Sequence, residues 1–187
     1  TAFDRYDEES EKLINCVIGT RHGETTSSPS VEIALAEILK KPGRAVGMHF
    51  IEPIDKTTIV EVVRGVKSTK EAHEKVMRFC QLIRKKGVCV NESPGNISTR
   101  MLIPIINEAC EILLEGIATI DDIDLTMRET FGHNIGPFEM ADKIGLDKIL
   151  KYMENLYAEY GESKYKASPV IKRLVRANHF GRYSGNG

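Results

Sequence analysis

The chain has 187 residues, enough for one full domain or two small ones. Hydrophobic residues make up 41% and charged residues 28%, which is ordinary for a globular protein with a core of its own. Lysine and arginine total 26 against 27 for aspartate and glutamate, so the net charge of −1 argues against a nucleic-acid-binding protein. No apolar run is long enough to span a membrane, so we expect no membrane partner.

The first half of the chain alternates helix and strand patterns. The expected elements are a charged helix at 3–14, a buried strand at 15–20, a Thr-, Ser- and Gly-rich loop at 21–30, a helix at 30–41 capped by Ser30, strands at 44–50 and 57–63, a helix at 68–87 capped by Ser68 or Thr69 and stopped by Gly87, and a strand at 88–91. Strands that alternate with helices predict an α/β layer with a largely parallel sheet.

After residue 91 the strand pattern ends and helix patterns follow. The expected helices are 93–116, beginning near Pro94 and containing Pro104; 119–131, capped by Thr119; 136–145; 146–161; and 168–181. The second half is therefore predicted to be an all-helical domain, with the boundary near Asn91–Pro94. In the first of these helices, a helix-spaced apolar stripe is expected to be core, with part of it a possible dimer seam: Met101, Leu102, Ile105, Ile106, Ala109, Ile112 and Leu113.

The four cysteines, Cys16, Cys80, Cys89 and Cys110, form no CxxC pair, and three of them lie in apolar segments. Reduced core cysteines are expected rather than disulfides or zinc ligands. This predicts an intracellular, cytoplasmic setting. Near residue 140, Glu139 and Asp142 have no common metal-ligand spacing, and we expect helix-capping or interdomain polar contacts from them.

One histidine and one glutamate stand out in the stretch GMHFIEPIDKTTIVEVV, residues 47–63. His49 ends one predicted strand and Glu61 lies on the next, so two adjacent strands joined by a short loop can bring the imidazole and the carboxylate within hydrogen-bond reach. Such a pair can take a proton from a substrate hydroxyl. The alternative is a buried histidine at a strand end and a glutamate on a solvated strand face, and the pattern alone favours this structural interpretation.

A family resemblance reverses that preference. GMHFIEPIDKTTIVEVVRG resembles the GxHFFNPxxxxxLVEVI stretch of the NAD-dependent L-3-hydroxyacyl-CoA dehydrogenases of fatty-acid β-oxidation and butyrate metabolism. Residues 88–147 resemble the family's xDxPGFxxNRxLxPxxNEA…GPFxxxDxxGLD, and residues 165–187 its closing PxxLxxxVxxGxxGRKxGxGFY. The resemblance implies a partial Rossmann-type α/β domain at 1–91 and a helical domain at 92–187 that dimerises with a second copy of the chain.

The resemblance also implies roles for individual residues. His49 and Glu61 would be the catalytic dyad, acting on an acyl-CoA substrate. Ser27 or Ser28, in the loop after the first strand, would contact the substrate oxygen. The chain departs from the family at two positions of interest: Glu52 stands where the family has Asn in HFFNP, and Thr99 stands where it has the Asn of NR.

Those two departures leave alternatives open. A carboxylate at Glu52 places negative charge near a site that develops oxyanion character, and the hydroxyl of Thr99 is shorter than an amide. The chain could therefore be a dehydrogenase for the usual 3-hydroxyacyl-CoA, a dehydrogenase for a different 3-hydroxy acid, or a non-catalytic dimerisation module with a degenerate active site.

The glycine-rich dinucleotide loop has no match in the chain. No GxGxxG follows a strand anywhere in the sequence. In the family that loop lies upstream of the position of residue 1, so we expect the chain to be part of a longer protein. We also expect that this chain alone binds NAD weakly, because the pyrophosphate lacks its helix N-terminus.

Overall fold

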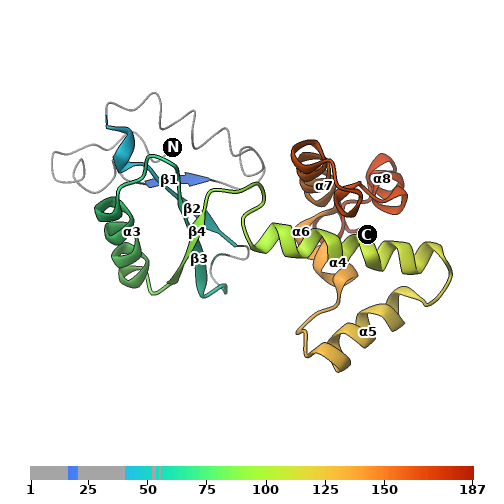
Figure 1. Ribbon diagram of the computed structural model, residues 1–187. Coiled ribbons are helices and arrows are strands. Elements are labelled where there is room, and N and C mark those ends of the chain that lie inside the picture. The colour runs from blue at the N-terminus through green and yellow to red at the C-terminus, as the bar shows by residue number, and fades with distance from the viewer. Residues whose placement is uncertain (1–16, 21–40, 52–53, 55) are drawn as a thin grey trace. The chain divides into compact units, whose positions relative to one another are not determined.

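The computed structural model describes residues 17–20, 41–51, 54 and 56–187 (Figure 1). The chain forms two compact units: Thr1–Ile97, called the sheet unit, and Ser98–Gly187, called the helical unit. This division matches the expected succession of an α/β layer and an all-helical domain. The helices expected at 3–14 and 30–41 lie outside the described residues.

The sheet unit contains a four-stranded sheet in the described part of the chain, with the order β1 (Val17–Thr20), β2 (Val46–Phe50), β3 (Ile59–Arg64) and β4 (Lys86–Asn91). The short 3-10 helix η1 (Pro42–Arg44) precedes β2. β1 and β2 are parallel, as are β3 and β4, but β2 and β3 are antiparallel. The sheet is therefore mixed. The loop from β2 to β3 is too short for the crossover that a parallel pair requires.

The core of the sheet unit lies between one face of the sheet and helix α3 (Lys70–Leu82), which Figure 1 shows beside the strands. The buried residues of this core are Val46, Met48, Val60, Val62, Ala72, Val76 and Cys80. Because side chains alternate along a strand, residues 49 and 61 point to the opposite face of the sheet. The apolar residues of β2 and β3 thus fix which face carries the polar pair.

Helix α3 begins where the sequence predicts and ends earlier. Thr69 caps its N-terminus by accepting a hydrogen bond from the Ala72 amide at 3.2 Å. The predicted stop at Gly87 is wrong, because Gly87 lies inside β4. The chain leaves the helix through Arg84, which takes the left-handed conformation at φ 56°, and the Lys85 amide donates to the Cys80 carbonyl at 2.8 Å. This closing pattern normally uses glycine.

The helical unit, all of whose residues the structure describes, contains five α-helices and two 3-10 turns. In chain order they are α4 (Ser98–Leu114), α5 (Ile120–Phe131), α6 (Pro137–Ile144), α7 (Leu146–Tyr160), η2 (Ser163–Tyr165), α8 (Pro169–Arg176) and η3 (Arg182–Ser184). The predicted cap of α5 is confirmed, since Thr119 accepts from the Asp122 amide at 3.2 Å. The predicted start of α4 near Pro94 is wrong, because Gly95 and Asn96 take left-handed conformations and the helix begins only at Ser98.

The core of the helical unit is built from α4, α6, α7 and α8. Ile103, Ile106, Cys110, Ile149, Met153 and Leu156 are among its buried residues. The predicted stripe on α4 is only partly right: Ile106 and Ala109 are buried, but Met101 is 64% exposed. The polar Asn107 is also buried, and its amide donates to the carbonyls of Lys164 and Lys166. It thereby ties η2 to α4.

Candidate functional site

Strand register places His49 beside Glu61. The two residues are direct partners in the antiparallel pairing of β2 with β3. Directly opposed residues of such a pair project their side chains from the same face, about 5 Å apart. The short loop and the alternation of the two strands therefore bring the imidazole and the carboxylate together, in the geometry that the stretch 47–63 predicts.

The pair is hydrogen-bonded and largely buried. His49 Nδ1 lies 2.6 Å from Glu61 Oε2, and the side chains are 11% and 2% exposed. The other carboxylate oxygen, Oε1, accepts from the backbone amide of Ile97 at 3.1 Å. With Nδ1 engaged by a carboxylate, the imidazole is held in one orientation, and its Nε2 is the atom through which it can exchange a proton with a bound molecule.

The end of β1 lies next to the histidine. In the parallel pairing of β1 with β2, Thr20 is the partner of His49. The sequence that carries Ser27 and Ser28 follows Thr20 directly. Both serines and Glu52 lie outside the described residues.

Thr99 belongs to the helical unit and lies in the first turn of α4, where it is half-buried. Its neighbour Arg100, to which the sequence patterns assign no role, is held by two tyrosines. The Arg100 Nε donates to the Tyr165 hydroxyl at 3.2 Å, and the guanidinium stacks over the Tyr160 ring at 4.6 Å. The Tyr165 hydrogen bond raises the pKa of Arg100. This arginine anchors the start of α4 to η2. Its position directly after Thr99 is the only feature of the sequence that points to it.

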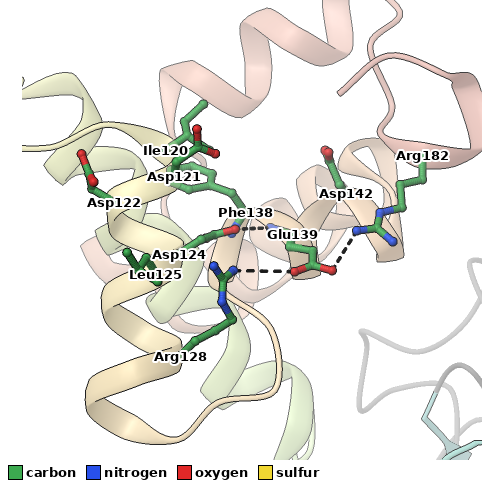
Figure 2. A pocket seen from close by; sticks show the side chains of 10 residues that line it. All are labelled: Ile120, Asp121, Asp122, Asp124, Leu125, Arg128, Phe138, Glu139, Asp142 and Arg182. Carbon is green, nitrogen blue, oxygen red and sulfur yellow. Dashed lines mark hydrogen bonds and ion pairs between the residues drawn. The ribbon is translucent and has the colours of Figure 1, made fainter.

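A second polar cluster lines a cavity of about 480 Å³ between α5 and α6 (Figure 2). Asp124 accepts hydrogen bonds from the amides of Phe138 and Glu139, each at 2.9 Å, so it caps α6 from the neighbouring helix. Glu139 pairs with Arg182 at 2.8 Å and faces Arg128 at 3.9 Å. Contrary to expectation, the capping residue is therefore Asp124, and these ion pairs of Glu139 stay within the helical unit.

Burial and neighbouring charges shift the pKa values of the two acids on α6 in opposite directions. Burial acts to raise the pKa of Glu139, but the hydrogen bond from Arg182 and the charge of Lys143 outweigh it and lower that pKa. Burial raises the pKa of Asp142, and the charge of Asp124 adds to this against the opposing effect of Arg182. Glu139 is paired with arginines and Asp124 with backbone amides, which is typical of a structural contact.

The described residues contain neither a metal site nor a membrane span. No group of three or more His, Cys, Asp or Glu side chains there is arranged to hold a metal ion. No helix in those same ranges combines the length and the apolar character that crossing a membrane requires.

Two family models together match nearly the whole chain. Residues 15–93 match the model described as 3-hydroxyacyl-CoA dehydrogenase, NAD binding domain. Residues 95–187 match the model described as 3-hydroxyacyl-CoA dehydrogenase, C-terminal domain.

Similar proteins and structures carry related names. The probable 3-hydroxybutyryl-CoA dehydrogenase of Bacillus subtilis (strain 168) is 40% identical over 163 residues, which cover 87% of this chain and 56% of that protein. The 3-hydroxybutyryl-CoA dehydrogenase of Clostridioides difficile is 40% identical over 158 residues, or 84% of this chain and 56% of that protein. The chain thus spans about half the length of the curated relatives it matches. The crystal structure of (S)-3-hydroxybutyryl-CoA dehydrogenase from Ralstonia eutropha has a TM-score of 0.83 and 32% identity, covering 100% of this chain and 67% of that one.

Proposed function

Because the chain belongs to the 3-hydroxyacyl-CoA dehydrogenase family, we propose that the whole protein interconverts a 3-hydroxyacyl-CoA and the 3-oxoacyl-CoA with NAD, in fatty-acid or butyrate metabolism. The relatives named as 3-hydroxybutyryl-CoA dehydrogenases favour a short acyl chain. The observation that carries the proposal is the largely buried hydrogen bond of 2.6 Å between His49 Nδ1 and Glu61 Oε2. A reducing, cytoplasmic setting is part of the proposal, supported by the free thiols of Cys80, Cys89 and Cys110.

His49 is the proposed proton acceptor in the oxidation direction. Nε2 takes the proton of the substrate's 3-hydroxyl as the C3 hydrogen leaves with its electron pair, and the C3–O bond becomes a carbonyl. NAD, when bound, accepts that hydride. Glu61 holds Nδ1 and stabilises the imidazolium that forms. Because Glu61 is almost fully buried, its charge acts on His49 through little water, which strengthens the interaction.

The polar residues around the substrate oxygen are also proposals. Thr99 and either Ser27 or Ser28 have hydroxyls that could donate to the oxygen of the 3-oxo group. The pairing of Thr20 with His49 supports a role for the serines, because their segment follows the end of β1. Glu52 is two residues past β2, and a charged side chain there would oppose oxyanion character unless it is neutralised or turned away.

NAD fits the residues of this chain only in part. Residues 15–93 match an NAD-binding domain, and β1 to β4 with α3 supply strands and a helix of such a domain. The sequence has no GxGxxG after a strand, so the chain offers no glycine-rich cradle for the pyrophosphate. We propose that residues of the whole protein outside this chain bind that part of NAD.

The test of the proposed function uses the full-length protein, with NADH absorbance followed in the presence of acetoacetyl-CoA. We expect oxidation of NADH that depends on both the protein and the CoA ester. The double substitution Thr99→Asn with Glu52→Asn then separates the alternatives. A rise in rate means that the present residues weaken the usual chemistry, and a fall means that the site has been retuned around Thr99 and Glu52 rather than lost. Absence of turnover at high protein concentration contradicts the proposal and favours the non-catalytic dimerisation module.

Homodimerisation through the helical unit is a further part of the proposal. Large apolar side chains at the end of α4 and along α5 are between 48% and 66% exposed: Leu114, Ile117, Ile120, Leu125 and Phe131. Within the helical unit, α5 packs on α6, and these side chains stay exposed to solvent. Exposed apolar side chains gathered on neighbouring elements indicate an interaction surface.

Replacing Ile117 by glutamate is expected to weaken self-association about tenfold or more, because a charge would be buried at an apolar contact. Sedimentation equilibrium measures the dimer dissociation constant. Tyr157→Glu, at a 42% exposed position on α7 outside this set, is the matched control and should leave the constant unchanged. Equal effects of the two substitutions, or a wild-type protein that stays monomeric, would contradict the proposal that this surface forms the dimer interface.

A further inference from the structure

The carboxylate of Glu61 is held at both oxygens. Oε2 lies 2.6 Å from His49 Nδ1, and Oε1 accepts the Ile97 amide at 3.1 Å. A carboxylate is planar, so an anchor on one oxygen fixes the direction in which the other presents its lone pairs. We propose that the turn Ser93–Ile97, which follows β4 and precedes α4, positions Glu61 and thereby sets the tautomer of His49. This inference rests on the proposed function of the dyad.

The backbone conformation of the turn directs the Ile97 amide toward Glu61. Gly95 and Asn96 are both left-handed, at φ 73° and 46°, and the Asn96 amide donates to the Ser93 carbonyl at 3.0 Å. Asparagine is one of the few residues other than glycine that adopts this conformation at small cost. The side chain of Ile97 is 49% exposed, and the residue reaches Glu61 through its main-chain amide. The identity of residue 96 therefore controls where the Ile97 N–H points.

The consequence for His49 concerns which ring nitrogen carries the proton. When Oε2 faces Nδ1, the neutral imidazole keeps its hydrogen on Nδ1, and the lone pair of Nε2 remains available as the base. When Glu61 is free to rotate, that preference weakens and more of the neutral imidazole carries its hydrogen on Nε2. In that tautomer Nε2 cannot accept a proton. Asn96 is thus assigned as a positioning residue that acts through Glu61.

The test compares Asn96→Val with Asn96→Gly. Valine is β-branched and disfavours the left-handed conformation, whereas glycine accepts it freely. Imidazole ¹⁵N NMR of the full-length protein, at a pH where the imidazole is neutral, reads the tautomer, and the His49 signals are assigned by their absence in His49→Gln. The wild type and Asn96→Gly are expected to show the Nδ1–H tautomer, and Asn96→Val a mixture with Nε2–H. An unchanged tautomer in Asn96→Val, with the Ile97 amide displaced, overturns the proposal.

A second variant covers the case in which Asn96→Val does not fold. Incorporation of the α-hydroxy acid analogue of isoleucine at position 97 removes the N–H donor and keeps the side chain. The same tautomer mixture is expected, and retention of the Nδ1–H form overturns the proposal.

In the full-length protein, Asn96→Val should lower kcat by up to about 100-fold, while the KM for NAD stays unchanged. A changed tautomer in a protein without dehydrogenase activity would contradict the proposed function and leave the positioning role intact. Full activity with an unchanged tautomer in Asn96→Val would contradict the positioning role and leave the proposed function intact.

Discussion

Replacing His49 by glutamine in the full-length protein is expected to lower kcat for oxidation of 3-hydroxybutyryl-CoA by about 10²- to 10⁴-fold, the range that a positioned general base contributes. Glutamine keeps a polar side chain near the same place, but its amide cannot accept the hydroxyl proton. The measurement is steady-state NADH formation with saturating substrates. KM should change far less than kcat, because proton transfer belongs to the chemical step.

His133→Gln is the matched control for this substitution. His133 is exposed in the segment between α5 and α6, so the same chemical change there is expected to leave kcat unaltered. If His49→Gln retains a rate within about threefold of the wild type, His49 is not the base, since that difference is far below the contribution of general-base catalysis.

Gly136→Ala is expected to destabilise the helical unit. Among the glycines of this unit with a negative φ, Gly136 is the position where an added methyl group should cost the most stability. A Cβ at residue 136 would lie 2.2 Å from Cγ and 2.4 Å from Cα of Asp124, so side chain and backbone would both have to move. Overpacking of this kind costs about 1–3 kcal/mol. Asp124 also caps α6, and loss of such a cap adds about 1 kcal/mol. Urea unfolding measures the change in the free energy of unfolding.

Gly116→Ala separates steric from conformational effects. Gly116 has φ 69°, but a Cβ added there would meet no heavy atom within 4 Å, so alanine should cost only about 1 kcal/mol. Gly136 has φ −78°, which alanine adopts without strain, so its cost is purely that of space. Equal losses of stability in the two variants would contradict the close packing of α5 against α6.

Local patterns in the sequence predicted most of the secondary structure. The alternation of apolar residues located β2 and β3, and Thr119 with the acids that follow it located the start of α5. The wrong boundaries have a common physical cause. Arg84 and Asn96 take left-handed conformations that sequence patterns assign to glycine, so α3 ends before Gly87 and α4 begins after Pro94. The predicted end of the last helix near Gly181 is also wrong: α8 ends at Arg176, and Asn178 is left-handed at φ 58°.

The candidate site shows where sequence alone is insufficient. The pattern offered His49 and Glu61, but only the strand register makes them direct partners. Contacts between distant residues left no local signal: the Ile97 amide reaches Glu61 across 36 positions, and Asp124 caps a helix 14 positions away. The functional weight of the pair came from the family resemblance, because a histidine and a glutamate on adjacent strands are common in proteins without catalysis.

The most direct test of the dyad is a comparison of kcat for four full-length proteins: the wild type, His49→Gln, Glu61→Gln and the double variant. Glu61 is proposed to act only through His49. Glu61→Gln is therefore expected to lower kcat in the wild-type background and to have no further effect once His49 is replaced. If Glu61→Gln lowers kcat by the same factor in both backgrounds, the two residues act independently and the dyad is contradicted.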